Sequence, residues 1–155
     1  MDTQRRRELI DRYREGTAVV EEAVRGLGEA DLDRRPPDGG WSARQVVHHL
    51  ADSEMMSAMR LRRLLAEDHA TLQGYDEAEF ARKLHYDTRP IEPSLAAMRA
   101  ARESTTTLLD ELSEDDWSRM GTHTESGPYS VETWLEIYAA HGHDHAEQIR
   151  RAVAS

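Results

Sequence analysis

The hydrophobic residues of this chain recur every three or four positions in four long segments, which is the spacing of amphipathic helices. The pattern predicts helices over residues 3–26, 42–66, 93–112 and 130–153. No segment shows the alternation of apolar and polar residues that is typical of strands. We therefore expect an all-α protein in which the four long helices pack as a four-helix bundle.

The connections between these helices differ in length and composition. Residues 27–40 contain two prolines and two glycines near their end, at 36, 37, 39 and 40, so we expect a loop without helix. Residues 69–93 form a long connection between the second and third helices, with a short helix expected over 75–84. Connections of this length usually act as lids or interfaces. Residues 113–129 are polar and are expected to form a loop.

The second long helix has a complete start signal. Ser42 is expected as the N-cap, and Gln45, three residues later, as its capping-box partner. Trp41 before the cap and Val46 after it are placed to pack together as a hydrophobic staple. Ser130 is the expected N-cap of the fourth helix.

Composition narrows the class of protein. A chain of 155 residues that is 38% hydrophobic fits one domain spanning residues 1–155. Its net charge of −10 argues against nucleic acid and anionic membranes as partners. It lacks an apolar run of the roughly 18 residues that cross a bilayer, and its N-terminus lacks the apolar region of a secretory signal, so we expect a cytoplasmic protein. Because there is no cysteine, any metal must be held by His, Asp or Glu.

Two histidines lie on the apolar side of the fourth helix. At about 100° per residue, His141 and His145 fall within the arc of Trp134, Tyr138 and Ile149. Buried imidazoles need partners, because an unsatisfied buried polar group costs about 1–3 kcal/mol. A metal ion satisfies both at this spacing of four residues. Hydrogen-bonded core histidines remain the alternative at this point.

A third histidine lies on the second helix. His49 is at the edge of that helix's apolar stripe, on the same strip as Gln45, Ser53, Met56 and Arg60. Three protein ligands plus solvent is the pattern of catalytic zinc. The other histidines are expected at the surface or in loops: His48, His69, His85, His123 and His143.

Several stretches together resemble the DinB superfamily, specifically its YfiT-like branch. They are WSARQVVHHLADSEMMSAMR (41–60), GYDEAEFARK (74–83), HTESG (123–127) and YAAHGHDHAEQI (138–149). The resemblance implies an up-down-down-up bundle, often a homodimer. It also implies a divalent metal, zinc or nickel, with open positions, bound by His49, His141 and His145. Members of the family are metal-dependent hydrolases or thiol S-transferases that use bacillithiol, mycothiol or glutathione.

The local chemistry favours one of these activities. Three neutral imidazoles leave a metal its full charge, which acidifies a bound water and deprotonates a bound thiol. Hydrolysis also needs an acid or base, but the chain lacks an HExxH motif, and Asp144 and Glu147 lie off the histidine strip. We therefore expect a low-molecular-weight-thiol S-transferase acting on a small molecule. A metal-dependent hydrolase and a non-catalytic metal-binding dimerisation module are the alternatives.

Residues around the three histidines are expected to assist them. Asp52 and Gln45 are candidates to hold the second nitrogen of His49, although the capping box competes for Gln45. The residues expected to line the substrate pocket are Ser53, Met56, Arg60 and Tyr138. Arg60 is placed to meet an anionic substrate or the carboxylate of a thiol.

Overall fold

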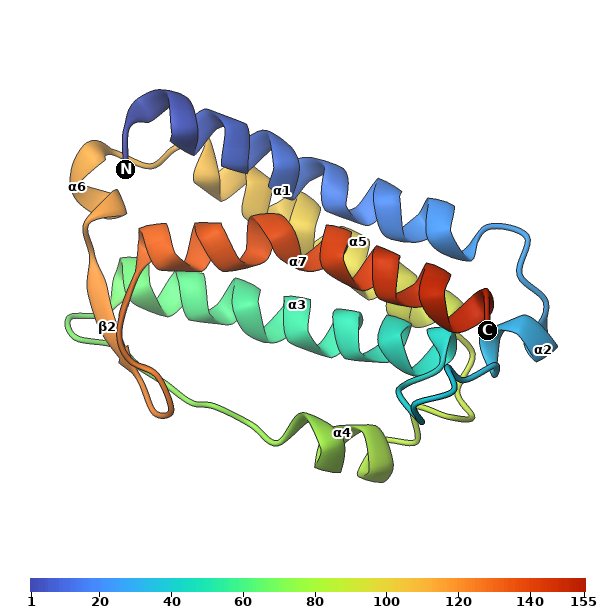
Figure 1. Cartoon of the computed structure of the whole chain (residues 1–155). Coiled ribbons are helices and arrows are strands. Elements are labelled where there is room, and N and C mark those ends of the chain that lie inside the picture. The colour runs from blue at the N-terminus through green and yellow to red at the C-terminus, as the bar shows by residue number, and fades with distance from the viewer.

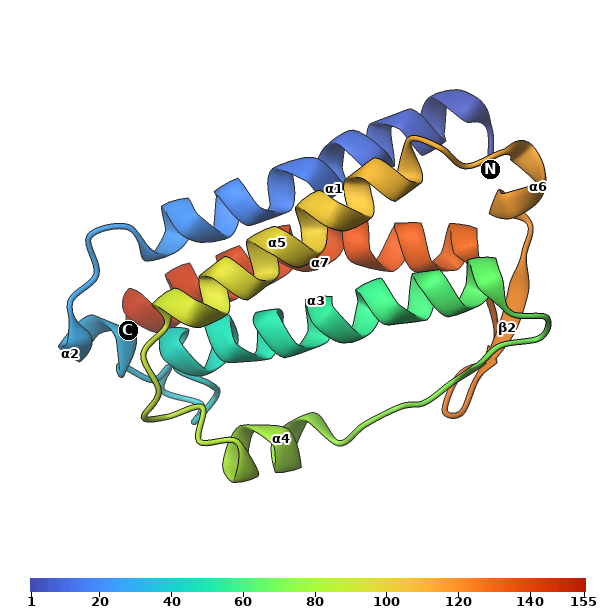
Figure 2. The same ribbon diagram turned by 180° about the vertical axis from the view of Figure 1, so that it is seen from behind.

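The computed structural model describes all 155 residues and shows four long helices side by side (Figure 1). They are α1 (Thr3–Val24), α3 (Ala43–Ala66), α5 (Glu92–Leu109) and α7 (Val131–Val153). Helices α1 and α7 run in one direction and α3 and α5 in the opposite one, as both views show (Figures 1 and 2). The prediction of an up-down-down-up four-helix bundle is thus confirmed. None of the helices is long and apolar enough to cross a membrane.

The parallel direction of α3 and α5 explains the long connection between them. The chain has to return along the bundle before α5 can begin, and it does so through β1 (Thr71–Leu72) and α4 (Glu77–Lys83). Helix α4 lies beside α3, away from α1 (Figures 1 and 2). The expected long connection and its short helix are both present.

The predicted helix starts are present with their hydrogen bonds. The Ser42 hydroxyl accepts from the backbone N–H of Gln45 at 3.3 Å, and the Gln45 side chain accepts from the Ser42 N–H at 3.0 Å. Ser130 accepts from the N–H of Thr133 at 2.9 Å. Trp41 packs against the apolar cluster that contains Val46. The N-termini of α3 and α7 are therefore fixed by the residues next to them in the sequence.

Two expected loops contain helical turns instead. Helix α2 (Glu29–Leu32) lies before the prolines of its loop and buries Leu32, so the expectation of no helix there was wrong. Helix α6 (Glu114–Trp117) begins at a capping box in which Ser113 accepts from the N–H of Asp116. Both are single turns held by local caps, too short to show a hydrophobic period.

The segment after α6 is a hairpin rather than a plain loop. Strands β2 (Met120–His123) and β3 (Gly127–Ser130) pair antiparallel, and β1 pairs parallel with β2, which gives the sheet order β1-β2-β3. Gly127 has φ of 79°, a conformation that glycine adopts without strain. Strands of two to four residues are too short for alternation to be recognised, and the sheet remains a minor part of a helical protein.

The core consists of two apolar clusters with a polar layer between them. One cluster, which we call the Trp134 cluster, has 14 buried residues, and the other, the Leu50 cluster, has 11. All four long helices contribute to both clusters. Between the two clusters, each helix places a polar residue or a glycine. These residues, the polar layer, are Gly16, Glu54, Arg102 and His141.

Candidate metal centre

The structure brings His49 of α3 together with His141 and His145 of α7. Their ligand nitrogens all lie within 4.8 Å of one another. The ring centroids of His49 and His145 are 4.7 Å apart, and those of His141 and His145 are 4.5 Å apart. His49 is buried, whereas His141 and His145 are partly exposed. The cluster thus lies at the edge of the polar layer with access to solvent.

Hydrogen bonds orient two of the three imidazoles. The Nδ1–H of His141 donates to Glu54 Oε1 at 3.0 Å, and the Nδ1–H of His145 donates to Gln148 Oε1 at 2.7 Å. Because a carboxylate and an amide oxygen only accept, each neutral ring carries its proton on Nδ1 and keeps the Nε2 lone pair free. A metal ligand needs that lone pair, and such acceptors are the usual partners of metal-binding histidines.

The surroundings keep two of these imidazoles, those of His49 and His145, neutral. Burial, together with the nearby His145 and His141, lowers the pKa of His49 to about 3. Burial and the nearby His141 lower the pKa of His145 to about 4. The buried Nδ1 of His49 has no hydrogen-bond partner in the chain. Three converging imidazoles, with at least two neutral at pH 7, are a donor set that fits a divalent cation.

Glu54, which was not predicted from the sequence, holds the ring of His141 in place through a hydrogen bond from the core. Its side chain is fully buried, and the oxygen that binds His141 also accepts from Arg102 Nη2 at 2.8 Å. Burial alone would raise the pKa of Glu54, but Arg102 and His141 hold it below its ordinary value. A signal was present, because Glu54 follows Leu50 by four residues and so occupies an inward position of an apolar stripe.

Arg102 links all four long helices at this level. From α5 it pairs with Glu54 of α3 and donates to the backbone carbonyls of Tyr13 in α1 and Tyr138 in α7. Gly16 makes room for it, because a Cβ there would lie 2.3 Å from Arg102 Nη1. The position of His141 therefore depends on a buried ion pair that the whole bundle encloses.

The two candidates expected to hold the second nitrogen of His49 have other partners. Asp52 accepts a hydrogen bond from the hydroxyl of Tyr86. The side-chain oxygen of Gln45 accepts a hydrogen bond from the backbone N–H of Ser42. Neither bonds to His49, whose Nδ1 is unpartnered. The expected role is thus not found, since the helix cap and the 67–91 connection compete for these side chains.

The residues expected to line a pocket occupy the same side of the bundle as the cluster. The Tyr138 ring lies 5.3 Å from that of His141, and Arg60 Nη1 donates to the Tyr138 hydroxyl at 3.3 Å. Ser53 is buried, one helical turn after His49. Met56 lines a hollow further along α3. These four side chains therefore extend from the histidines along α3 and α7.

Two other histidines are buried, contrary to expectation. His48 is inaccessible: its Nε2–H donates to the Arg89 carbonyl at 3.0 Å, and Ser94 lies 2.7 Å from its Nδ1. His123 is 9% exposed and accepts from the N–H of Glu125 at 3.2 Å. His48 faces the start of α5, which the helical wheel of α3 alone does not reveal. Hydrogen bonds on both its ring nitrogens give His48 a structural role.

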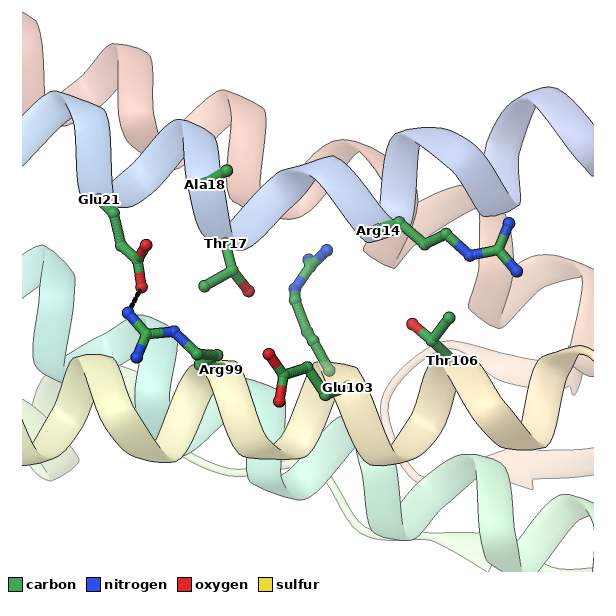
Figure 3. A pocket seen from close by; sticks show the side chains of 8 residues that line it. Arg14, Thr17, Ala18, Glu21, Arg99, Glu103 and Thr106 are labelled. Atoms are coloured by element: carbon green, nitrogen blue, oxygen red, sulfur yellow. Dashed lines mark hydrogen bonds and ion pairs between the residues drawn. The ribbon is translucent and has the colours of Figure 1, made fainter.

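A separate hollow of about 360 Å³ lies between α1 and α5. Its lining contains no histidine, and Figure 3 shows the ion pair of Arg99 with Glu21 at one end. Arg14 at the other end pairs with Asp11 and Asp110. Four of the five charged side chains that line this hollow already have ion-pair partners, so it is not the candidate reaction centre.

Fold and site together define a class of protein: an up-down-down-up helical bundle with three histidines suited to a divalent cation. The family model described as DinB superfamily matches residues 12–149. The chain belongs to this superfamily, and its resemblance to the family is confirmed.

Individual relatives agree with this assignment. A protein of Oceanobacillus iheyensis named "Putative metal-dependent hydrolase" is 37% identical over 142 residues, which cover 92% of this chain and 82% of the relative. A protein of Geobacillus thermodenitrificans with the same name is 35% identical over 145 residues, which cover 92% of this chain and 81% of the relative. The structure of YfiT from Bacillus subtilis, described as a probable metal-dependent hydrolase with an unusual four-helix bundle topology, superposes with a TM-score of 0.91. The two sequences are 31% identical, and the match covers 96% of this chain and 86% of YfiT. The names of the relatives and the histidine cluster together indicate a metal-dependent enzyme with a divalent metal.

Proposed function

We propose that this chain is a metal-dependent thiol S-transferase in which His49, His141 and His145 hold one zinc or nickel ion. The observation that carries the proposal is the convergence of their ligand nitrogens within 4.8 Å, with hydrogen-bond acceptors on the Nδ1 of two of them. A divalent cation on three neutral imidazoles keeps its full charge and supplies the acidity that removes a proton from a thiol. The low pKa values of His49 and His145 keep both lone pairs available at neutral pH.

The chain's own residues hold this centre and shape its surroundings. Glu54 and Gln148 fix the rings of His141 and His145 through their Nδ1 atoms. The Tyr138 ring packs edge-on against that of His141, and its hydroxyl accepts a hydrogen bond from Arg60. In the proposed reaction the thiol sulfur forms a bond to an electrophilic carbon, the leaving group departs with its electron pair, and the thiol proton passes to solvent.

A thiol is preferred to water because the site provides no free carboxylate base. Glu54 is fully buried and is held through its Oε1 by Arg102 and His141, and Asp52 accepts from Tyr86. Asp144 is exposed on the outer side of α7. A bound cation would deprotonate a thiol outright, whereas it would lower the pKa of a water only to about 7, so that attack by water would depend more on a nearby base.

Hydrolysis of a small substrate is the second candidate, and the names of the relatives favour it. The same three histidines would then serve to activate water. Both candidates require the metal, so they differ only in the nucleophile.

The experiment begins with protein purified without a polyhistidine tag. Stoichiometric zinc or nickel, lost in His141→Ala, is expected, and no metal in any preparation would overturn the proposal. The loaded protein is then assayed for conjugation of 1-chloro-2,4-dinitrobenzene with bacillithiol, mycothiol and glutathione, alongside hydrolysis of a panel of esters. Conjugation supports the transferase, ester cleavage alone supports the hydrolase, and inactivity in both assays with metal present would leave a metal-binding module.

A further inference from the structure

Three methionines of α3 border an apolar hollow of about 330 Å³ that none of the histidines lines. The hollow, which we call the methionine hollow, is lined by Met55, Met56, Met59, Arg60, Arg63, Leu72 and Gln73. Met55 is 44% exposed and Met59 57% exposed. Flexible thioether side chains adapt to apolar groups of different shape, and this volume is in the range of small-molecule sites.

Arg60 at the edge of the methionine hollow has no acidic partner. It donates to the Gln73 carbonyl at 2.7 Å and to the Tyr138 hydroxyl at 3.3 Å, and it takes part in none of the ion pairs of the chain. Arg63, which lines the same hollow, is paired with Glu67 through two hydrogen bonds of 2.9 Å. In a chain of net charge −10, the unpaired guanidinium of Arg60 is complementary to an anion from outside.

Arg60 also lies between the methionine hollow and the metal centre. The hydroxyl of Tyr138 accepts from Arg60, and the ring of Tyr138 lies 5.3 Å from that of His141. On α3, Met56 follows His49 by seven residues, which is two turns or about 10 Å along the same side of the helix. A ligand of modest length in the hollow can therefore reach the histidines.

We propose that the methionine hollow binds the apolar part of an amphipathic anion whose acid group pairs with Arg60. The substrate class is thus a carboxylate or related acid that carries a hydrocarbon group. That its reactive part reaches His141 rests on the proposed function, whereas binding in the hollow requires no metal.

The test compares octanoate with octanol, which share the apolar chain but differ in charge. Isothermal titration calorimetry is carried out on metal-free and zinc-loaded protein. Octanoate is expected to bind at least about tenfold more tightly than octanol, because a charge-assisted hydrogen bond contributes about 1.5–3 kcal/mol and 1.4 kcal/mol is a factor of ten. Arg60→Gln is expected to remove this preference, so that octanoate binds no more tightly than octanol. The matched control Arg63→Gln keeps the preference, because the charge of Arg63 is already paired with Glu67.

A double variant tests the apolar contact. It combines Met55→Gln with Met59→Gln, both at exposed positions. This variant is expected to bind octanoate and octanol less tightly, and to a similar degree. The proposal is overturned if wild-type protein binds neither probe, or if Arg63→Gln acts like Arg60→Gln. It is also overturned if sedimentation shows that the double variant converts a dimer to a monomer, because a second copy then covers the hollow. Octanoate binding without metal binding would refute only the proposed function, and metal binding without octanoate binding would refute only this inference.

Discussion

Arg102 donates a hydrogen bond of 2.8 Å to the carboxylate of Glu54, and both side chains are buried at the centre of the bundle. The same carboxylate oxygen accepts from His141. Two charges are placed in an apolar interior at a considerable desolvation cost, which their mutual attraction offsets. We interpret the pair as the structural base of the candidate metal centre, because it fixes one ligand from inside the core.

Replacing Glu54 by Gln is expected to reduce both stability and metal affinity. The amide still accepts from His141, but Arg102 is left buried without a counter-charge, which costs about 3–5 kcal/mol of unfolding free energy. Loss of the charge behind a ligand lowers metal affinity about 10- to 100-fold. Urea unfolding of metal-free protein and zinc competition with a chelator measure the two effects. The double variant Glu54→Gln with Arg102→Met is expected to regain stability but not metal affinity; equal recovery of both would contradict a positioning role for Glu54.

Gly16 is expected to tolerate no side chain. A Cβ at this position would lie 2.3 Å from Arg102 Nη1, so Gly16→Ala displaces the guanidinium and costs about 1–3 kcal/mol through overpacking. Zinc affinity is expected to fall as well, since Arg102 holds Glu54. Gly28→Ala is the control, because the atom nearest to its Cβ is 4.0 Å away. Chelator competition and urea unfolding compare the two variants, and an equal effect of both would refute the steric explanation.

The long elements and the three histidines could be predicted because they depend on local patterns. Helical periodicity over about 20 residues gives the four long helices, and the wheel of a single helix places His141 and His145 on its inner side. The N-cap at Ser42 could be predicted because it is formed by residues that are close in the sequence. One-turn helices and strands of four residues or fewer have no period to detect, so α6 and the hairpin around Gly127 were missed.

Partners across helices could not be predicted in the same way. Glu54 and Arg102 stand on apolar stripes 48 residues apart in the sequence, and only packing shows that they meet. Asp52 was expected near His49, but the 67–91 connection brings Tyr86 to its carboxylate. A helical wheel gives the side of one helix and says nothing about which residue of another helix faces it.

The N-cap of α3 is expected to contribute to stability and not to metal binding. Ser42→Ala removes the acceptor for the Gln45 N–H and is expected to cost about 1 kcal/mol. His49 lies seven residues further on, held by packing, so chelator competition should give an unchanged zinc affinity. Ser118→Ala changes an exposed hydroxyl after α6 and serves as the control, with an expected change within about 0.5 kcal/mol. A large loss of zinc affinity in Ser42→Ala would show that the helix start itself positions the ligand.

The stability of the metal-free protein is expected to fall as the pH is lowered from about 6.5 to about 4. The pKa of His49 is lowered to about 3 and that of His145 to about 4, whereas both take up protons near 6.5 in the unfolded chain. The unfolded state therefore binds more protons in this range, and each histidine removes up to about 1.4 kcal/mol of unfolding free energy per pH unit. Urea unfolding at pH 7, 6 and 5 measures how steeply the unfolding free energy changes with pH. In His49→Gln this slope is expected to be smaller, because the contribution of His49 is lost. The exposed His85, with φ of 54°, provides the control His85→Asn, because Asn adopts this conformation readily. A slope that is the same in wild-type protein and His49→Gln would mean that His49 is not held neutral by its surroundings.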